Sequence, residues 1–234
     1  MSDLLQTVQP TAILFSVDPD FSNQTYKGHV KIDYDVTGET SEVQIQTSSD
    51  FQIQDVRVAL FYEFNQGSKV FVSHCVEDYT LENDILTIPM REPLNPEKDE
   101  NGFYITVDYI GQVQGPGYNQ INEETQEANL GEGRAHTVFP SYEGIFYPRI
   151  WLSIYSDYGV TVDSNLTRTN SNETDGRMKH NFYGENQTAD ELFFSITLPS
   201  NPEGENTEQQ QEETEPAAEE QPQEEPSEEE PQQE

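Results

Sequence analysis

The side chains best suited to metal binding or nucleophilic catalysis are widely spaced in this sequence. The four histidines are His29, His74, His136 and His180, and the one cysteine is Cys75. Zinc ligands typically occur in pairs such as H-E-x-x-H or C-x-x-C, and neither pattern is present. His74 and Cys75 are adjacent in a predicted strand, so their side chains point to opposite faces and do not form a thiol–imidazole pair. We therefore predict no catalytic residue, no metal ligand and no cofactor.

Sequence motifs of nucleophilic enzymes and of nucleotide-binding loops are absent, and one segment has the spacing of a calcium-binding loop. The sequence has no G-x-S-x-G elbow, no glycine-rich phosphate loop and no G-x-G-x-x-G motif. Asp18 and Asp20, in the segment VDPDFSN, have the spacing of a calcium-binding D-x-D loop. The same residue types form ordinary turns, and we favour a turn here.

Two kinds of modification site are present. Four N-x-[ST] sequons start at Asn23, Asn165, Asn172 and Asn186, which suggests a secreted ancestry. Ser227 precedes three glutamates, a context that suits an acidophilic kinase. Phosphorylation there would add charge to an already acidic segment and extend it.

Charge excludes several classes of partner. The 234 residues carry 45 acidic and 11 basic side chains, giving a formal net charge of −34. Binding to nucleic acid or to an anionic membrane requires clustered Lys and Arg, so we predict neither. No run approaches about 18 consecutive apolar residues, and no membrane span is expected. A single cysteine and the lack of a recognisable signal peptide favour a reducing, cytoplasmic location, although the four sequons point the other way.

The chain divides at a sharp change of composition. Residues 200–234 are rich in Glu, Gln and Pro and contain no aromatic side chain. Such a segment does not bury enough apolar surface to offset its ordering entropy, so we predict a disordered acidic tail. Residues 10–199 hold all the aromatic side chains and form the predicted folded domain, preceded by a flexible N-terminus at 1–9.

The folded domain reads as β-strands. From Tyr26 to Val36, apolar and polar residues alternate with a period of two. Further strands are expected within 11–17, 42–46, 55–62, 69–75, 85–90, 104–109, 149–155 and 192–198. The apolar phase shifts between Ile53 and Val56, which indicates a bulge or bend. Turn-forming residues fill 163–176, and 121–129 is at most a short polar helix. The prediction is an all-β fold of roughly ten strands, a sandwich or paired sheets.

The order of these motifs resembles one family. Pro10 to Val58 looks like the opening of the zinc aminopeptidases of the aminopeptidase N (gluzincin) family, which have an aromatic-x-G-x-V-x-I strand. Residues 86–118, 162–166 and 180–196 resemble later parts of the same domain. The matching positions are Tyr26, Gly28, Val30, Ile32, Tyr104, Ile105, Val107, Tyr109, Gly111, Tyr118, Ser164, Asn165, Phe182, Thr188, Leu192 and Phe194. The resemblance implies the saddle-like β-domain that precedes the catalytic domain.

The departures from the family are as informative as the matches. The family's catalytic domain, with G-x-M-E-N and H-E-x-x-H, would begin where the acidic tail stands. The family's β-domain also supplies a T-Q-x-[EQ]-P segment that holds the substrate amine. Here that segment is Thr137, Val138, Phe139 and Pro140. Val138 stands where the family has Gln, and the Glu or Gln that precedes the family's proline is missing. The resemblance therefore implies a relative without peptidase activity.

Three functions remain open. The first is a non-catalytic binding or scaffolding domain with an unidentified protein partner. The second is a modulator of an intact aminopeptidase, for which we expect an exposed apolar patch on one edge. The third is a ligand- or carbohydrate-binding sandwich that uses Trp151, Tyr155 and Tyr158 as a platform. Alternation places Trp151 and Tyr155 on one face, but we expect Trp151 to serve the core.

Overall fold

A computed structural model describes residues 5–64, 68–97 and 102–199. These residues form fifteen β-strands and two short 3₁₀ helices, η1 (Ala135–Thr137) and η2 (Ala189–Glu191). The all-β prediction is confirmed, and the strands are more numerous than expected. None of the helices in this part of the chain has the length and apolar character needed to cross a membrane.

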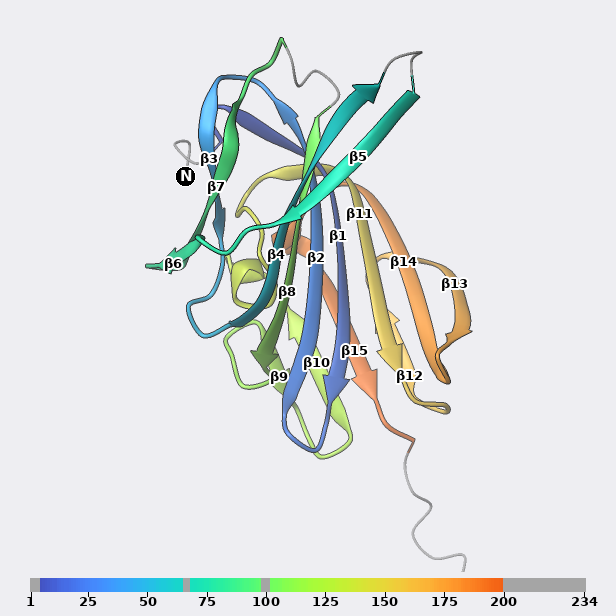
Figure 1. The fold of residues 1–234 in the computed structure, drawn as a ribbon. Helices are drawn as coiled ribbons and strands as arrows, with labels where there is room; N and C mark the ends of the chain where they lie inside the picture. Colours follow the sequence, from blue (N-terminus) through green and yellow to red (C-terminus); the bar gives the residue numbers. More distant parts are fainter. Residues whose placement is uncertain (1–4, 65–67, 98–101, 200–234) are drawn as a thin grey trace, which may run out of the picture. The chain divides into compact units, whose positions relative to one another are not determined.

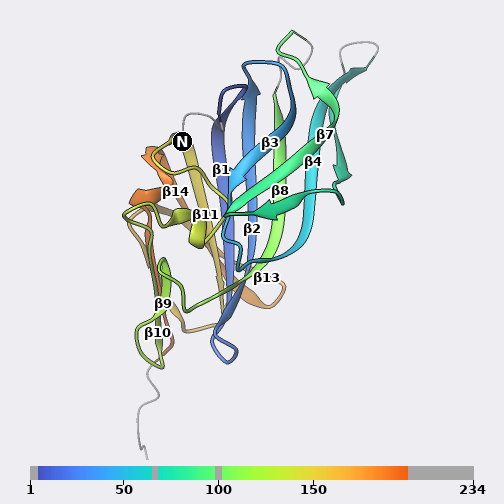
Figure 2. The same ribbon diagram turned by 90° about the vertical axis from the view of Figure 1, so that its left-hand side faces the viewer.

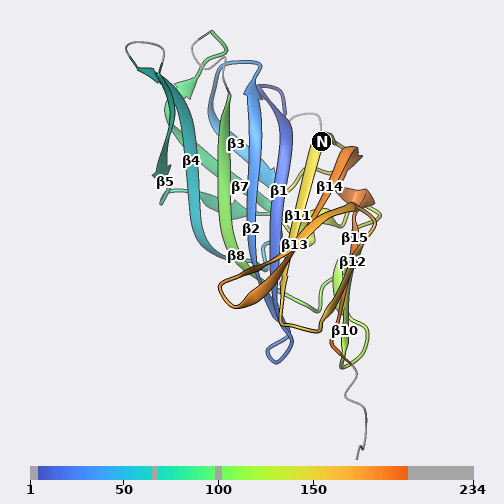
Figure 3. The same cartoon turned by 90° about the vertical axis from the view of Figure 1, so that its right-hand side faces the viewer.

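One large sheet dominates the fold (Figures 1 and 3). Its eight strands lie in the order β13-β14-β11-β1-β2-β8-β4-β5. β1 and β11 are parallel, and every other neighbouring pair is antiparallel. The strands are β1 (Val8–Asp20), β2 (Thr25–Val36), β4 (Gln52–Phe64), β5 (Ser68–Cys75), β8 (Phe103–Gln112), β11 (Phe146–Ser156), β13 (Thr167–Thr174) and β14 (Arg177–Thr188).

Two smaller sheets cover one face of the large sheet (Figure 2). The first has the order β3-β7-β6, and the second has the order β12-β15-β10-β9. Tyr142, which hydrogen-bonds to the Gln44 carbonyl of β3, also contacts Tyr34 of β2, while Phe194 of β15 contacts Phe15 of β1. The strands are β3 (Thr40–Gln46), β6 (Thr80–Glu82), β7 (Ile85–Leu94), β9 (Tyr118–Gln120), β10 (Thr125–Asn129), β12 (Thr161–Ser164) and β15 (Phe193–Thr197). We call the covered side the inner face and the opposite side the outer face.

The alternation in the sequence decides which side chains enter the core. In β2, Tyr26, Val30, Ile32 and Tyr34 are all buried on the inner face. Gly28 lies between them because the ring of Tyr109 occupies the space of a side chain there: a Cβ on Gly28 would sit 2.1 Å from Tyr109 Cζ. In β4, the register shifts between Ile53 and Asp55, so the predicted bulge is confirmed.

One boundary prediction needs correction. β1 begins at Val8, so the strand includes two residues that we assigned to a flexible N-terminus. Val8 is 1% exposed, and burial of this side chain fixes the start of the strand. The predicted disordered tail at 200–234 and residues 1–4 lie outside the described residues.

Two segments that we interpreted as a possible helix and as a turn region contain strands. The 121–129 segment, taken as a short helix at most, contains β10, which pairs with β9 and β15. The predicted turn region 163–176 contains β13, an edge strand whose side chains are almost all exposed. A strand exposed on both faces needs no apolar alternation, so the periodicity that reveals the other strands is missing there.

Candidate binding surfaces

The segment that the resemblance assigns to substrate binding, 137–140, lies inside the fold. Val138 and Phe139 are fully buried, Pro140 is buried and Thr137 is half-buried. The ring of Phe139 stacks on Phe15 of β1 with a centroid distance of 4.0 Å. The segment therefore packs between the large sheet and the smaller ones as part of the core.

The polar groups of this segment are held by core residues. The Val138 carbonyl oxygen accepts hydrogen bonds from the hydroxyls of Tyr26, at 2.6 Å, and Tyr109, at 2.8 Å. Burial raises the pKa of both tyrosines well above the usual value, so both remain protonated donors. Thr137 Oγ1 donates to the Arg134 carbonyl at 2.7 Å. These hydrogen bonds hold the segment in the interior. Val138 and Phe139 could therefore contact a ligand only after local unfolding.

The histidines and the cysteine are dispersed over the fold. His29 Nδ1 lies 2.6 Å from Asp108 Oδ1 on the outer face, and His136 Nδ1 lies 3.1 Å from Glu143 Oε1. Cys75 is exposed and donates to Asp55 Oδ1, so it is a surface thiol. Within the described ranges, no three His, Cys, Asp or Glu side chains are grouped so that they could hold a metal ion.

His180 and His74 lie near opposite edges of the large sheet. The His180 ring nitrogens contact Ser156 Oγ at 3.0 Å and Ser171 Oγ at 2.9 Å. Burial, followed by the charge of Arg168, lowers the pKa of His180. Burial, followed by the charge of Arg91, also lowers the pKa of His74. His74 Nε2 has no hydrogen-bond partner among the described residues.

The predicted modification sites have exposed asparagines. Asn23, Asn165, Asn172 and Asn186 are all exposed. Asn165 ties the β12–β13 turn to β15, because its Oδ1 accepts from the Phe193 amide at 2.8 Å. Ser227 lies outside the described residues. Whether any of these sites is modified stays a prediction.

The acidic pair at the end of β1 has two different sets of partners. Asp18 pairs with Arg177, whereas Asp20 accepts from the backbone amide of Asn23 at 3.0 Å and from its side chain at 2.7 Å. Hydrogen bonding from Asn23 lowers the pKa of Asp20. Asp20 therefore stabilises the β1–β2 turn, the arrangement that we favoured over a calcium loop.

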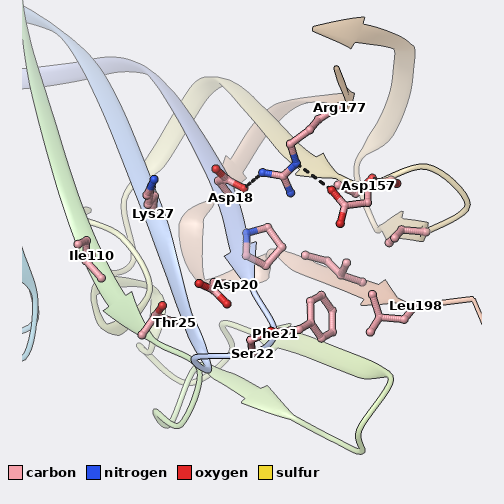
Figure 4. Close-up of a pocket in the computed structure, with 14 residues that line it drawn as sticks. Asp18, Asp20, Phe21, Ser22, Thr25, Lys27, Ile110, Asp157, Arg177 and Leu198 are labelled. Carbon is pink, nitrogen blue, oxygen red and sulfur yellow. Dashed lines mark hydrogen bonds and ion pairs between the residues drawn. The ribbon is translucent and has the colours of Figure 1, made fainter. Parts of the chain in front are cut away.

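A depression of about 780 Å³ adjoins this turn (Figure 4). Arg177, which pairs with Asp18, also contacts Asp157 at 3.2 Å, so three of the charged groups in the depression satisfy one another. Lys27 and Ile110 are cross-strand partners on the outer face, whereas Ile196 belongs to the buried side of β15. Because its lining comes from both faces of the large sheet, the depression is the open end of the sandwich and not an enclosed ligand cavity.

A group of aromatic side chains lies on the outer face, away from the core. Trp151 is half-buried there and contacts Tyr183 at 5.3 Å, so the expectation that Trp151 belongs to the core is wrong. Tyr155 shares this face, as alternation predicted. Two cations lie over these rings, Arg149 at 5.5 Å from Trp151 and Lys179 at 5.3 Å from Tyr155. Tyr158 is exposed in the turn that follows β11.

The edge strand β5 exposes consecutive apolar side chains. Val70, Phe71 and Val72 are 41%, 48% and 46% exposed. Neighbouring residues in a strand point to opposite faces, so β5 is uncovered on both sides. On the outer face, Phe71 contacts Phe61 at 4.9 Å and Tyr104 at 5.1 Å. This strand was expected from the sequence, but its exposure was not.

Comparison with known proteins supports the fold only. The chain matches no protein-family model, and it matches no curated protein. Among solved structures, it is similar to a mutant of an M1 zinc metallopeptidase from Deinococcus radiodurans, with a TM-score of 0.64 and 9% sequence identity. The match covers 82% of this chain and 42% of that one. The chain thus shares an all-β architecture with less than half of a zinc metallopeptidase.

Proposed function

We propose that this chain is a non-catalytic binding domain, of the same kind as the N-terminal β-domain of the zinc aminopeptidases. The observation that carries the proposal is the burial of 137–140, the position at which the resemblance places the substrate-holding loop. Val138 and Phe139 form core contacts, and the Val138 carbonyl is occupied by two tyrosine hydroxyls. A side chain that holds a substrate amine has no counterpart in this arrangement.

The similarity to an M1 zinc metallopeptidase supports the kinship of the fold. The test is an aminopeptidase assay of the purified full chain with added zinc and several aminoacyl reporters. We expect no turnover above a buffer control. Activity that copurifies with the chain and disappears on chelation would overturn the proposal.

A second candidate, modulation of an intact aminopeptidase, is favoured by the exposed apolar side chains of β5. Adding the chain to an active aminopeptidase should change its KM or kcat. The change should be lost when Phe71 is replaced by a lysine. An unchanged rate at saturating chain concentration would eliminate this candidate.

A third candidate, carbohydrate binding, is favoured by the outer-face position of Trp151 and Tyr155. Aromatic rings on an open sheet face can pack against sugar rings. Trp151→Ala should then abolish binding to a panel of neutral oligosaccharides. Tyr104→Ala, an outer-face aromatic on β8, is the matched control and should leave binding intact.

A further inference from the structure

The free edge of β5 lacks several features that usually keep an edge strand from pairing with another chain. Natural edge strands carry prolines, bulges, inward-pointing charges or a covering segment, because a free strand edge pairs readily with another chain. β4 and β5 pair without a register shift from Arg57 and Cys75 to Phe64 and Ser68. β5 contains no proline, and its one lysine, Lys69, stands next to its first residue. Among the described residues, β4 is its only strand neighbour.

The exposed side chains extend the edge into a surface that has two faces. Phe71 continues the outer-face cluster of Phe61 and Tyr104, so its ring is already oriented by aromatic contacts. Val70 and Val72 point to the other side. Leu60, the cross-strand partner of Val72, is 9% exposed, whereas Val72 is 46% exposed. The smaller sheets therefore cover the inner face as far as β4 and leave β5 uncovered.

The surface next to the end of β5 is hollowed to form a recess. A depression of about 520 Å³ is lined by His74, Val76, Met90 and Arg91, with Glu77 and Asp78 beside them. Glu77 and Asp78 are exposed. His74 Nε2 lies in this region without a hydrogen-bond partner among the described residues. The recess therefore offers two carboxylates and one guanidinium, that of Arg91, beside the end of the strand.

We propose that β5 binds an extended, basic segment of another protein, which adds to the eight-stranded sheet as a further strand. The inference rests on the proposed binding function and names its surface and partner. Strand addition supplies backbone hydrogen bonds along the edge, and alternate side chains of the incoming strand pack on Phe71 or on Val70 and Val72. The net charge of −34 favours a basic partner and opposes a second copy of this chain.

The test uses the full chain and an end-blocked synthetic peptide of eight residues, in which valine and threonine alternate between terminal lysines. Binding is measured by fluorescence anisotropy at physiological salt. The matched variants are Phe71→Lys and Phe146→Lys, which change the charge equally. Phe146 is also exposed, at 64%, but lies on β11. A second peptide carries N-methyl groups on its four central amides, which removes those four backbone N–H donors at unchanged charge.

We expect Phe71→Lys to weaken binding at least tenfold and Phe146→Lys to change it less than twofold. The N-methylated peptide should bind at least tenfold more weakly, and hydrogen exchange of β5 amides should slow only with the unmodified peptide. Equal binding by both variants, or by both peptides, would reduce the attraction to net charge and overturn the proposal.

A wild-type dimer that Phe71→Lys dissociates would overturn it too, because the edge would then serve a second copy. Peptidase turnover is measured separately in the same samples. Failure of the β5 site is therefore distinguishable from failure of the non-catalytic proposal.

Discussion

The large sheet ends in β13 on one side and in β5 on the other, and both strands lack a second neighbour among the described residues (Figure 3). β13 reads TRTNSNET, is exposed along nearly its whole length and shifts register between Arg168 and Asn170. β5 reads SKVFVSHC, pairs regularly and exposes three apolar side chains in succession.

Polar side chains and a bulge are the features by which edge strands avoid pairing with other chains. β13 has both, whereas β5 pairs with β4 without a bulge and exposes three apolar side chains between its polar ends. Since the two edges belong to one sheet, general solubility requirements do not explain the difference. The contrast supports the proposal that β5, unlike β13, pairs with another chain.

The largest expected effect tests whether the two edges share one cooperative sheet. Gly28→Ala places a Cβ 2.1 Å from the buried ring of Tyr109, which is itself tied to the Val138 carbonyl. We expect a loss of about 3 kcal/mol in the free energy of unfolding, measured by urea denaturation. Gly115→Ala, with no atom within 4 Å of the new Cβ, is the control and should be neutral. Separate transitions for the two edges would contradict the single-sheet view.

A smaller effect concerns the hydrogen bonds that hold 137–140 beneath the centre of the sheet. Tyr26→Phe or Tyr109→Phe alone leaves one donor to the Val138 carbonyl, so each should cost about 1 kcal/mol. The double variant removes both donors from a buried carbonyl, and its cost should exceed the sum of the two. Chemical denaturation of the four proteins gives the coupling. Strict additivity would show that the two hydroxyls do not act on a shared group.

Acidification should lower the free energy of unfolding through His180 and His74, which lie near the two edges of the large sheet. The pKa values of His180 and His74 are lowered in the folded chain, so the unfolded chain binds more protons. Stability is therefore complete above the ordinary histidine pKa of 6.5 and is lost as the pH falls through the lowered values. Thermal unfolding between pH 7.5 and 5.5 measures the loss, and His180→Asn and His74→Asn should each reduce the slope. A flat profile for the unmodified chain would refute this expectation.

The smallest effect on stability is expected when a polar side chain is placed in β5 and an apolar one in β13. Val72→Lys in β5 and Asn170→Val in β13 both replace exposed side chains, so each should change the free energy of unfolding by less than about 0.5 kcal/mol. Their effects on peptide binding should differ. Val72→Lys should weaken binding of the basic peptide, measured by fluorescence anisotropy, whereas Asn170→Val should leave that binding unchanged. An equal loss of binding in both variants would remove the distinction between the edges.

The predictability of each region follows from its burial pattern. β2 and β8 were readable because one face of each is buried, and a buried face imposes a period of two on the sequence. β13 and β10 were missed because their side chains do not alternate between apolar and polar types. The run Val70-Phe71-Val72 carried a signal that was available but unused: consecutive apolar residues in a strand need either a core on both faces or a partner.

The order of apolar and polar side chains is enough to predict the all-β class, the inner-face residues of the central strands and the bulge near Ile53. It does not predict that Val138 and Phe139 are core, that Trp151 faces outward, or that β5 lies beyond the cover of the smaller sheets. Those outcomes depend on which strand becomes an edge and which face is covered. Both are set by the pairing of segments distant in the chain, and local patterns do not encode that pairing.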